Sequence, residues 1–146
     1  MILITEKRDL FSVPHGWYLA HCISADCAMG AGIAKEFSAR YSGMRKYLKQ
    51  NGVDISCPFS NVGTAAVYAN VINLITKEKY NHKPTYESLR NSLRYVADWI
   101  IPKYGIDHIA MPKIGCGLDK LEWERVLEII NEVFEGMNLY ILVCER

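Results

Sequence analysis

The stretch WYLAHCISADCAMGAGIAKEF, residues 17–37, joins a strand-length apolar run to a glycine-containing loop and then to a helical pattern. Residues 17–23 are almost entirely apolar, which is typical of a strand that is covered on both faces. Gly30 and Gly32 punctuate the loop that follows. From Gly32 the apolar residues recur at the spacing of one helix face until Ser42-Gly43 interrupts them. The stretch therefore predicts a strand, a tight loop and a helix in direct succession.

The same alternation of strands and helices extends on both sides of this unit. Residues 64–76 predict either two strands or one bent strand, and residues 51–63 predict a loop around Asn51-Gly52, Pro58 and Gly63. The other predicted elements are a strand from Met1, a short helix at 44–48, a long helix from Pro84-Thr85 closed by Pro102, a strand at 108–111, a helix at 123–134 stopped by Gly136, and a strand at 139–144. This order predicts an α/β fold with a mainly parallel sheet between two layers of helices.

The composition favours one compact domain over residues 1–146. A chain of 146 residues can bury a full hydrophobic core, and half of its residues are hydrophobic. The formal net charge of +1 excludes a charged surface built to hold an extended polyanion. The first residues lack the pattern of a signal peptide, and no apolar run approaches the ~20 residues of a membrane span, so we expect a soluble protein without a membrane partner.

The cysteines and histidines indicate a reduced compartment and no metal centre. Five cysteines are an odd number, and Cys22 and Cys27 are too far apart for a redox pair. A cytoplasmic location is the simplest interpretation, with the nucleus as the alternative in a eukaryote. The four histidines do not lie near one another at ligand spacing, so we expect no metal and no cofactor.

Three segments follow predicted strands, where α/β sheets bind their ligands: residues 24–32, Lys77 and residues 113–119. Backbone amides of a glycine loop at a helix N-terminus suit a phosphate or diphosphate, although such glycines also occur in purely structural turns. Asp119 begins the pattern DKLE, which fits a helix N-cap as well as a functional carboxylate. Lys77, like Lys79 and Lys83, could be solvated, or it could point into the cleft as an amine nucleophile.

Several separated blocks together resemble the macrodomains of the terminal ADP-ribose protein glycohydrolase group. The blocks are AHCIS (20–24), MGAGIA (29–34), LITK (74–77), HKPTYE (82–87) and MPKIGCGLD (111–119). The resemblance runs from Asp9 to the last predicted strand. It implies a three-layer α/β/α macrodomain around a mixed sheet, with ADP-ribose in a cleft at the sheet edge.

The resemblance also implies roles for particular residues. The diphosphate would lie along Met29, Gly30, Ala31, Gly32 and Ile33. The distal ribose would contact Ser24, Gly115, Cys116, Gly117 and Leu118, and the adenine would contact Asp9 and the backbone of Leu10. The chain departs from the group in two places: Arg8 stands where a glycine usually precedes the adenine aspartate, and residues 143–146 offer no aromatic ring.

In the group that the chain resembles, the lysine attacks the anomeric carbon of the distal ribose and the aspartate handles the protons. This assigns Lys77 as covalent nucleophile and Asp119 as general acid and base. The implied substrates are ADP-ribosylated glutamate or aspartate and O-acetyl-ADP-ribose. Two alternatives remain open, namely removal of ADP-ribose from DNA bases and a non-catalytic ADP-ribose reader. We expect a monomer whose partners are ADP-ribose and ADP-ribosylated protein, or ADP-ribosylated nucleic acid.

Overall fold

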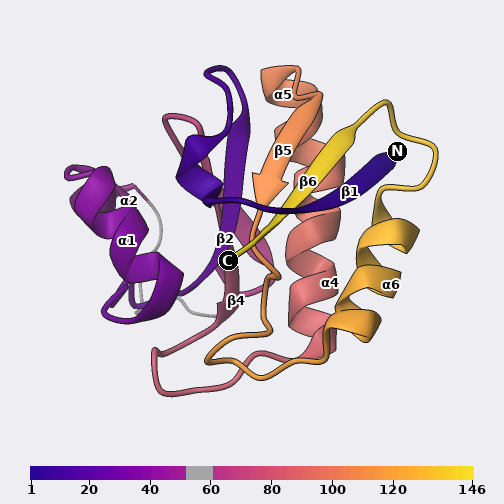
Figure 1. Cartoon of the computed structure of the whole chain (residues 1–146). Helices are drawn as coiled ribbons and strands as arrows, with labels where there is room; N and C mark the ends of the chain where they lie inside the picture. Colours follow the sequence, from indigo (N-terminus) through magenta and orange to yellow (C-terminus); the bar gives the residue numbers. More distant parts are fainter. Residues whose placement is uncertain (52–60) are drawn as a thin grey trace.

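The computed structural model describes residues 1–51 and 61–146, and within them one mixed sheet lies between layers of helices (Figure 1). The strands run in the order β1-β6-β5-β2-β4-β3. Their bounds are Ile2–Lys7 for β1, Tyr18–Ser24 for β2, Thr64–Tyr68 for β3, Val71–Lys77 for β4, His108–Met111 for β5 and Tyr140–Glu145 for β6. All neighbouring pairs are parallel except β3 and β4. The predicted mixed, mainly parallel sheet is confirmed.

Helices cover both faces of this sheet (Figure 1). On one face lie the 3-10 turn Leu10–Ser12, helix α1 (Gly32–Arg40) and helix α2 (Met44–Gln50). On the other face lie α4 (Tyr86–Tyr95), α5 (Ile101–Tyr104) and α6 (Trp123–Val133). A hydrophobic cluster fills each interface, the larger one beneath α4 and α6 and the smaller beneath α1 and α2. The predicted three-layer arrangement follows from strands such as β4, whose residues 71–76 are all buried.

The prediction that Pro102 closes the long helix is wrong. The helix passes through a π-helical turn, Val96–Ile100, and continues as α5 until Gly105, whose φ is 62°. Pro102 stands in the first turn of α5, directly after the π-helical turn, where its missing amide hydrogen interrupts the hydrogen-bond ladder without ending the helix. Gly105 adopts the left-handed conformation that ends the helix.

Residues 64–76 form two antiparallel strands and not one bent strand. Ala69 adopts a left-handed φ of 51° in the turn between β3 and β4. Part of the loop predicted around Asn51-Gly52 and Pro58 lies outside the described residues, as does Cys57.

Candidate functional site

A cleft lies at the edge of the sheet where β2, β4 and β5 end. Its first part is a cavity of about 770 Å³ lined by Cys22, Ile23, Ser24, residues 28–34, Lys77, Tyr80, Lys83, residues 112–115 and residues 117–119. A second cavity of about 680 Å³ is lined by Leu10, Gly32, Ile33, Glu36, Pro112, Lys113, Cys116, Gly117 and residues 144–146. The two cavities share five lining residues, so they form one elongated cleft with room for an extended ligand.

The first glycine loop, residues 24–32, presents backbone amides to this cleft. Met29 and Gly32 adopt left-handed φ angles of 49° and 59°. Helix α1 starts at Gly32, and its N-cap Ala31 offers no side chain to cap the first turn. The free amide hydrogens and the positive end of the helix dipole therefore face the cleft, where they can bind a phosphate group.

The second glycine loop, residues 113–119, faces the first one. A Cβ atom on Gly32 would lie 3.4 Å from Cδ1 of Leu118 in the second loop. Gly115 has a φ of 75°, and a Cβ there would lie 2.9 Å from Cδ1 of Leu121, so a side chain at this position would be strained and would displace Leu121. The amide of Leu121 donates to the Gly115 carbonyl at 2.8 Å and closes the loop. The loop ends by presenting Asp119 to the cleft.

The interpretation of Asp119 as a helix cap is wrong. Helix α6 begins at Trp123 with Glu122 at the N-cap position. Lys120 adopts a left-handed φ of 62°, and its amide donates to the Gly117 carbonyl, so the chain turns before the helix starts. The carboxylate of Asp119 is thereby left for a partner outside the helix.

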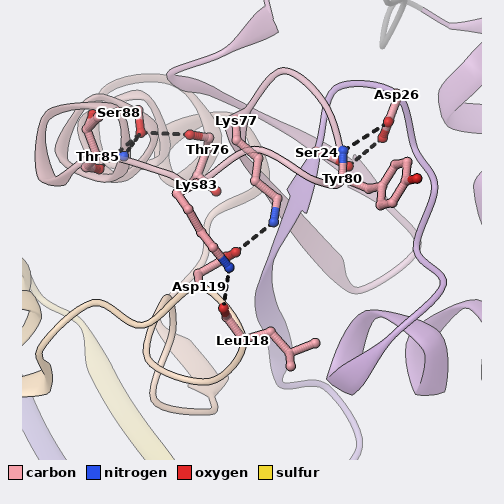
Figure 2. A network of polar contacts seen from close by, with 10 residues as sticks. All are labelled: Ser24, Asp26, Thr76, Lys77, Tyr80, Lys83, Thr85, Ser88, Leu118 and Asp119. Atoms are coloured by element: carbon pink, nitrogen blue, oxygen red, sulfur yellow. Dashed lines mark hydrogen bonds and ion pairs between the residues drawn. The ribbon is translucent and has the colours of Figure 1, made fainter.

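That partner is Lys77, whose Nζ donates to Oδ1 of Asp119 at 2.6 Å (Figure 2). Each of the two side chains is only 14% exposed. The buried body of β4 fixes the backbone of Lys77 at the strand end and aims its side chain across the cleft. The structure therefore does not support a solvated Lys77, in contrast to Lys79, which is exposed. The pair places an amine and a carboxylate in direct contact inside the cleft.

A third polar group, Asp26, ties the first glycine loop to the segment after β4. Its carboxylate accepts from the Ser24 hydroxyl and from the amide of Tyr80 at 3.0 Å (Figure 2). It also accepts from the amide of Ala28 at 3.1 Å. Burial alone would raise the pKa of Asp26, but these hydrogen bonds and the nearby Lys77 lower it below its ordinary value. Asp26 is therefore an ionised anchor that fixes Ser24 at the cleft.

Three cysteines line the cleft, and all three are held as thiols. Burial and the neighbouring Asp119 carboxylate raise the pKa of Cys22 to about 12, although the nearby Lys77 opposes them in part. Burial also raises the pKa of Cys116 and of Cys144. Since only the thiolate is a strong nucleophile, none of the three is a strong nucleophile near neutral pH.

All but one of the residues predicted at the site line the cleft. Ser24, residues 29–33, Lys77 and Gly115, Gly117, Leu118 and Asp119 line the first cavity, and Leu10 and Cys116 line the second. Asp9 lies outside both linings. It accepts from the amide of Phe11 and lies 3.7 Å from Arg146. The structure thus leaves Asp9 at the rim of the second cavity.

Some lining residues had no signal strong enough to predict them. Tyr80 lines the first cavity and is 68% exposed. A single tyrosine in a loop has no sequence pattern that predicts a place in a binding site. Lys83 also lines it, and its Nζ donates to the carbonyl of Leu118 at 2.7 Å. The sequence signal for Lys83 is its place in the block HKPTYE, residues 82–87. Arg146 lines the second cavity and pairs with Glu36 at 2.6 Å.

The described residues contain neither a cluster of metal-ligating side chains nor a helix suited to cross a membrane. Within 1–51 and 61–146, no three or more histidine, cysteine, aspartate or glutamate side chains gather as metal ligands. Among these same residues, none of the helices has the length and apolar character that a bilayer crossing requires.

The sequence of this chain matches a protein-family model and two known proteins. The family model for the Macro domain matches residues 21–130. The chain is 43% identical over 141 residues to ADP-ribose glycohydrolase OARD1 of Homo sapiens, covering 94% of this chain and 87% of that protein. The OARD1 protein of Bos taurus matches with the same identity and coverage.

Solved structures share the whole fold. The macrodomain of Mycobacterium tuberculosis DarG superposes with a TM-score of 0.85 at 20% identity, covering 99% of this chain and 98% of that one. The macrodomain of Thermus aquaticus DarG gives a TM-score of 0.83 at 21% identity, with 99% of each chain covered. At this level of identity the likeness concerns the fold alone.

Proposed function

Because this chain belongs to the macrodomain family, we propose that it binds ADP-ribose in the cleft and hydrolyses the bond between ADP-ribose and an acceptor. The bovine and human relatives, both named ADP-ribose glycohydrolase, support this reaction. The length of the joined cavities suits the ligand, with the diphosphate at the start of α1 and the adenosine in the second cavity.

One observation carries the catalytic part of the proposal, namely the contact between Lys77 and Asp119. A reader of ADP-ribose needs amides for the diphosphate but no amine and carboxylate facing each other beyond it. Here the two groups lie 2.6 Å apart in the same cavity as the diphosphate-binding loop. An amine with an adjacent proton acceptor is the arrangement that nucleophilic catalysis requires.

The reaction that we propose begins with transfer of a proton from Lys77 to Asp119. The neutral amine then forms a bond to the anomeric carbon of the distal ribose, and the bond to the acceptor oxygen breaks. The acceptor leaves with the proton from Asp119. The sugar ring opens to a Schiff base on Lys77, and water activated by Asp119 adds to it and releases ADP-ribose.

The leaving group favours acyl acceptors as substrates. A carboxylate leaves the anomeric carbon readily, so we propose ADP-ribosylated glutamate and aspartate side chains, and O-acetyl-ADP-ribose, as the substrates. ADP-ribosylated protein is then the macromolecular partner.

The exposed ring of Tyr80 supports a second candidate, an ADP-ribosylated DNA base. Tyr80 lines the cavity that holds Lys77 and Asp119, and the residue is 68% exposed. A flipped base could stack on such a ring without extended DNA contacts.

Both candidates are tested by offering the protein glutamate-linked, serine-linked and thymidine-linked ADP-ribose in excess chelator. We expect free ADP-ribose from the glutamate-linked substrate. We expect Lys77→Arg, which keeps the charge but cannot act as the amine, to bind ADP-ribose and release none. Lys79→Arg is the matched control and should behave as wild type, because Lys79 does not line the cavity. Release by Lys77→Arg at the wild-type rate would leave a water-attack mechanism, and no release by wild type would leave a reader.

A further inference from the structure

We propose that Lys83 is a positioning residue for this reaction, because its ammonium group fixes the turn that carries Asp119. The inference rests on the hydrolase function proposed above. It concerns a lysine that the sequence interpretation had grouped with the solvated lysines after β4.

Two lysines, one at the end of β4 and one in the segment that follows it, contact consecutive residues of the second glycine loop (Figure 2). Lys77 binds the carboxylate of Asp119 at 2.6 Å, and Lys83 binds the carbonyl oxygen of Leu118 at 2.7 Å. The carbonyl of Leu118 belongs to the peptide group that joins Leu118 to Asp119. A hydrogen bond from an ammonium group to this carbonyl therefore restrains the backbone of Asp119 directly.

The backbone of Lys83 is itself well anchored. Pro84 is buried, and Thr85 and Ser88 form a reciprocal capping box that starts α4. The hydroxyl of Ser88 also donates to the Thr76 carbonyl at 2.7 Å, which ties this helix start to the end of β4. Since the residues beside Lys83 are ordered by the core, the lysine loses little backbone freedom in reaching Leu118.

The turn that Lys83 holds has two backbone hydrogen bonds besides this contact. Asp119 lies before α6 and is not held by that helix, and Leu118 is 64% exposed. The turn is closed by the bond from the Lys120 amide to the Gly117 carbonyl at 3.2 Å, and the wider loop by the bond from the Leu121 amide to the Gly115 carbonyl at 2.8 Å. The ion pair to Lys77 is the remaining contact of the carboxylate among the hydrogen bonds and ion pairs of the described residues.

The reaction removes that ion pair at the step where Asp119 is needed. Transfer of the proton from Lys77 to Asp119 neutralises both groups, and the Lys77 nitrogen then bonds to the sugar, so the original ion pair no longer holds Asp119. The Lys83 contact is unaffected by this change, because it uses the Leu118 carbonyl. Lys83 therefore keeps Asp119 in place while the carboxyl group protonates the leaving acceptor and then activates water.

The test compares Lys83→Met, which removes the donor, with Lys83→Arg, which retains one, and with Lys79→Met. Lys79→Met is the matched control, because Lys79 is exposed, lies in the same segment and does not line the cavity. Each variant is assayed for kcat and KM on glutamate-linked ADP-ribose, for ADP-ribose affinity by calorimetry and for its melting temperature. Hydride trapping with mass spectrometry measures the adduct on the Lys77 peptide.

We expect Lys83→Met to lower kcat by about 10²-fold, the size of effect that a misplaced catalytic group produces. Its ADP-ribose affinity and melting temperature should match wild type. The trapped adduct should increase, because the release of ADP-ribose from Lys77 by water is slowed. Lys83→Arg should recover most of the rate, and Lys79→Met should be normal.

Three results would overturn the inference: a wild-type kcat in Lys83→Met, a change in KM alone, or an equal loss in Lys79→Met, which would indicate attraction of the anionic substrate by charge. If wild type itself releases no ADP-ribose, the proposed function fails. In that case crystal structures of wild type and Lys83→Met test the positioning role on its own. A Leu118–Asp119 turn that has not moved in the variant would overturn it.

Discussion

Lys77 and Asp119 are separated by 42 positions in the sequence and form an ion pair of 2.6 Å at the end of a cleft. Strand β4 supplies the amine, and the second glycine loop supplies the carboxylate. The strand is fixed by its buried apolar residues, whereas the loop is fixed by Gly115 and by the Lys83 contact. The two halves of the pair are thus positioned by different means and respond differently to substitution.

Replacing Asp119 by asparagine should separate its chemical role from its structural one. The amide oxygen can still accept the hydrogen bond from Lys77, but the side chain cannot exchange a proton. We expect a stability loss of about 1 kcal/mol or less and a fall in kcat of about 10²–10⁴-fold. Urea unfolding and release of ADP-ribose measure the two effects. A fully active variant would leave Asp119 without an acid–base role.

Trapping the intermediate should locate the covalent bond. Wild-type protein turning over glutamate-linked ADP-ribose in the presence of a hydride reductant should gain one ADP-ribosyl unit on the peptide that contains Lys77. Tandem mass spectrometry identifies the modified residue. The same adduct on Lys79 or Lys83 in place of Lys77 would assign the nucleophile to a different amine.

Gly32→Glu should weaken ADP-ribose binding without unfolding the protein. The new side chain would start 3.4 Å from Leu118, between the two glycine loops, and its carboxylate would repel the diphosphate. We expect at least about a tenfold loss of affinity, or about 1.4 kcal/mol. Gly105→Glu is the matched control, because Gly105 has a similar φ of 62° in open space far from the lining of either cavity. Equal affinities in the two variants would mean that the first loop is only a structural turn.

His21 should make the fold sensitive to acid. The residue is fully buried, its Nε2 lies 2.6 Å from Oδ1 of Asn73, and its ring stacks on Phe37 at 3.9 Å. Burial lowers its pKa from 6.5 to about 4, and the contact with Asn73 offsets this only in part. The unfolded chain therefore binds a proton that the folded one does not, so stability is complete above pH 6.5 and falls as the pH drops toward 4.

The size of this effect is set by the pKa difference. We expect His21 to cost the fold up to about 3 kcal/mol between about pH 7 and pH 4. His21→Gln removes the titrating group and can still donate to Asn73. Urea unfolding should therefore show wild type losing more stability than the variant over this range. Parallel pH curves would contradict the assignment.

The alternation of strands and helices, the three layers and the position of the cleft were predictable, because burial periodicity and the strand-end rule depend only on local sequence. The position of Asp119 outside α6 was not predictable from local sequence, since DKLE fits a helix cap and the left-handed Lys120 places the residue before the helix. The prediction that the helix ends at Pro102 was wrong because the π-helical turn before it allows the chain to remain helical. Tyr80 and Lys83 depend on contacts between segments distant in sequence, which no local pattern contains.

The pairing of the edge strand β1 has a consequence for how the chain folds. Its ladder partner is β6, with Ile2 opposite Tyr140, so β1 must wait for a strand that is made much later in the sequence. Until β6 arrives, β1 has no neighbour, and β5 carries an open edge that other chains can join. Pairing across such a sequence separation slows folding. On a ribosome the central strands β2, β3 and β4 can assemble early, whereas the N-terminal strand stays exposed to chaperones and to aggregation until synthesis has passed residue 145.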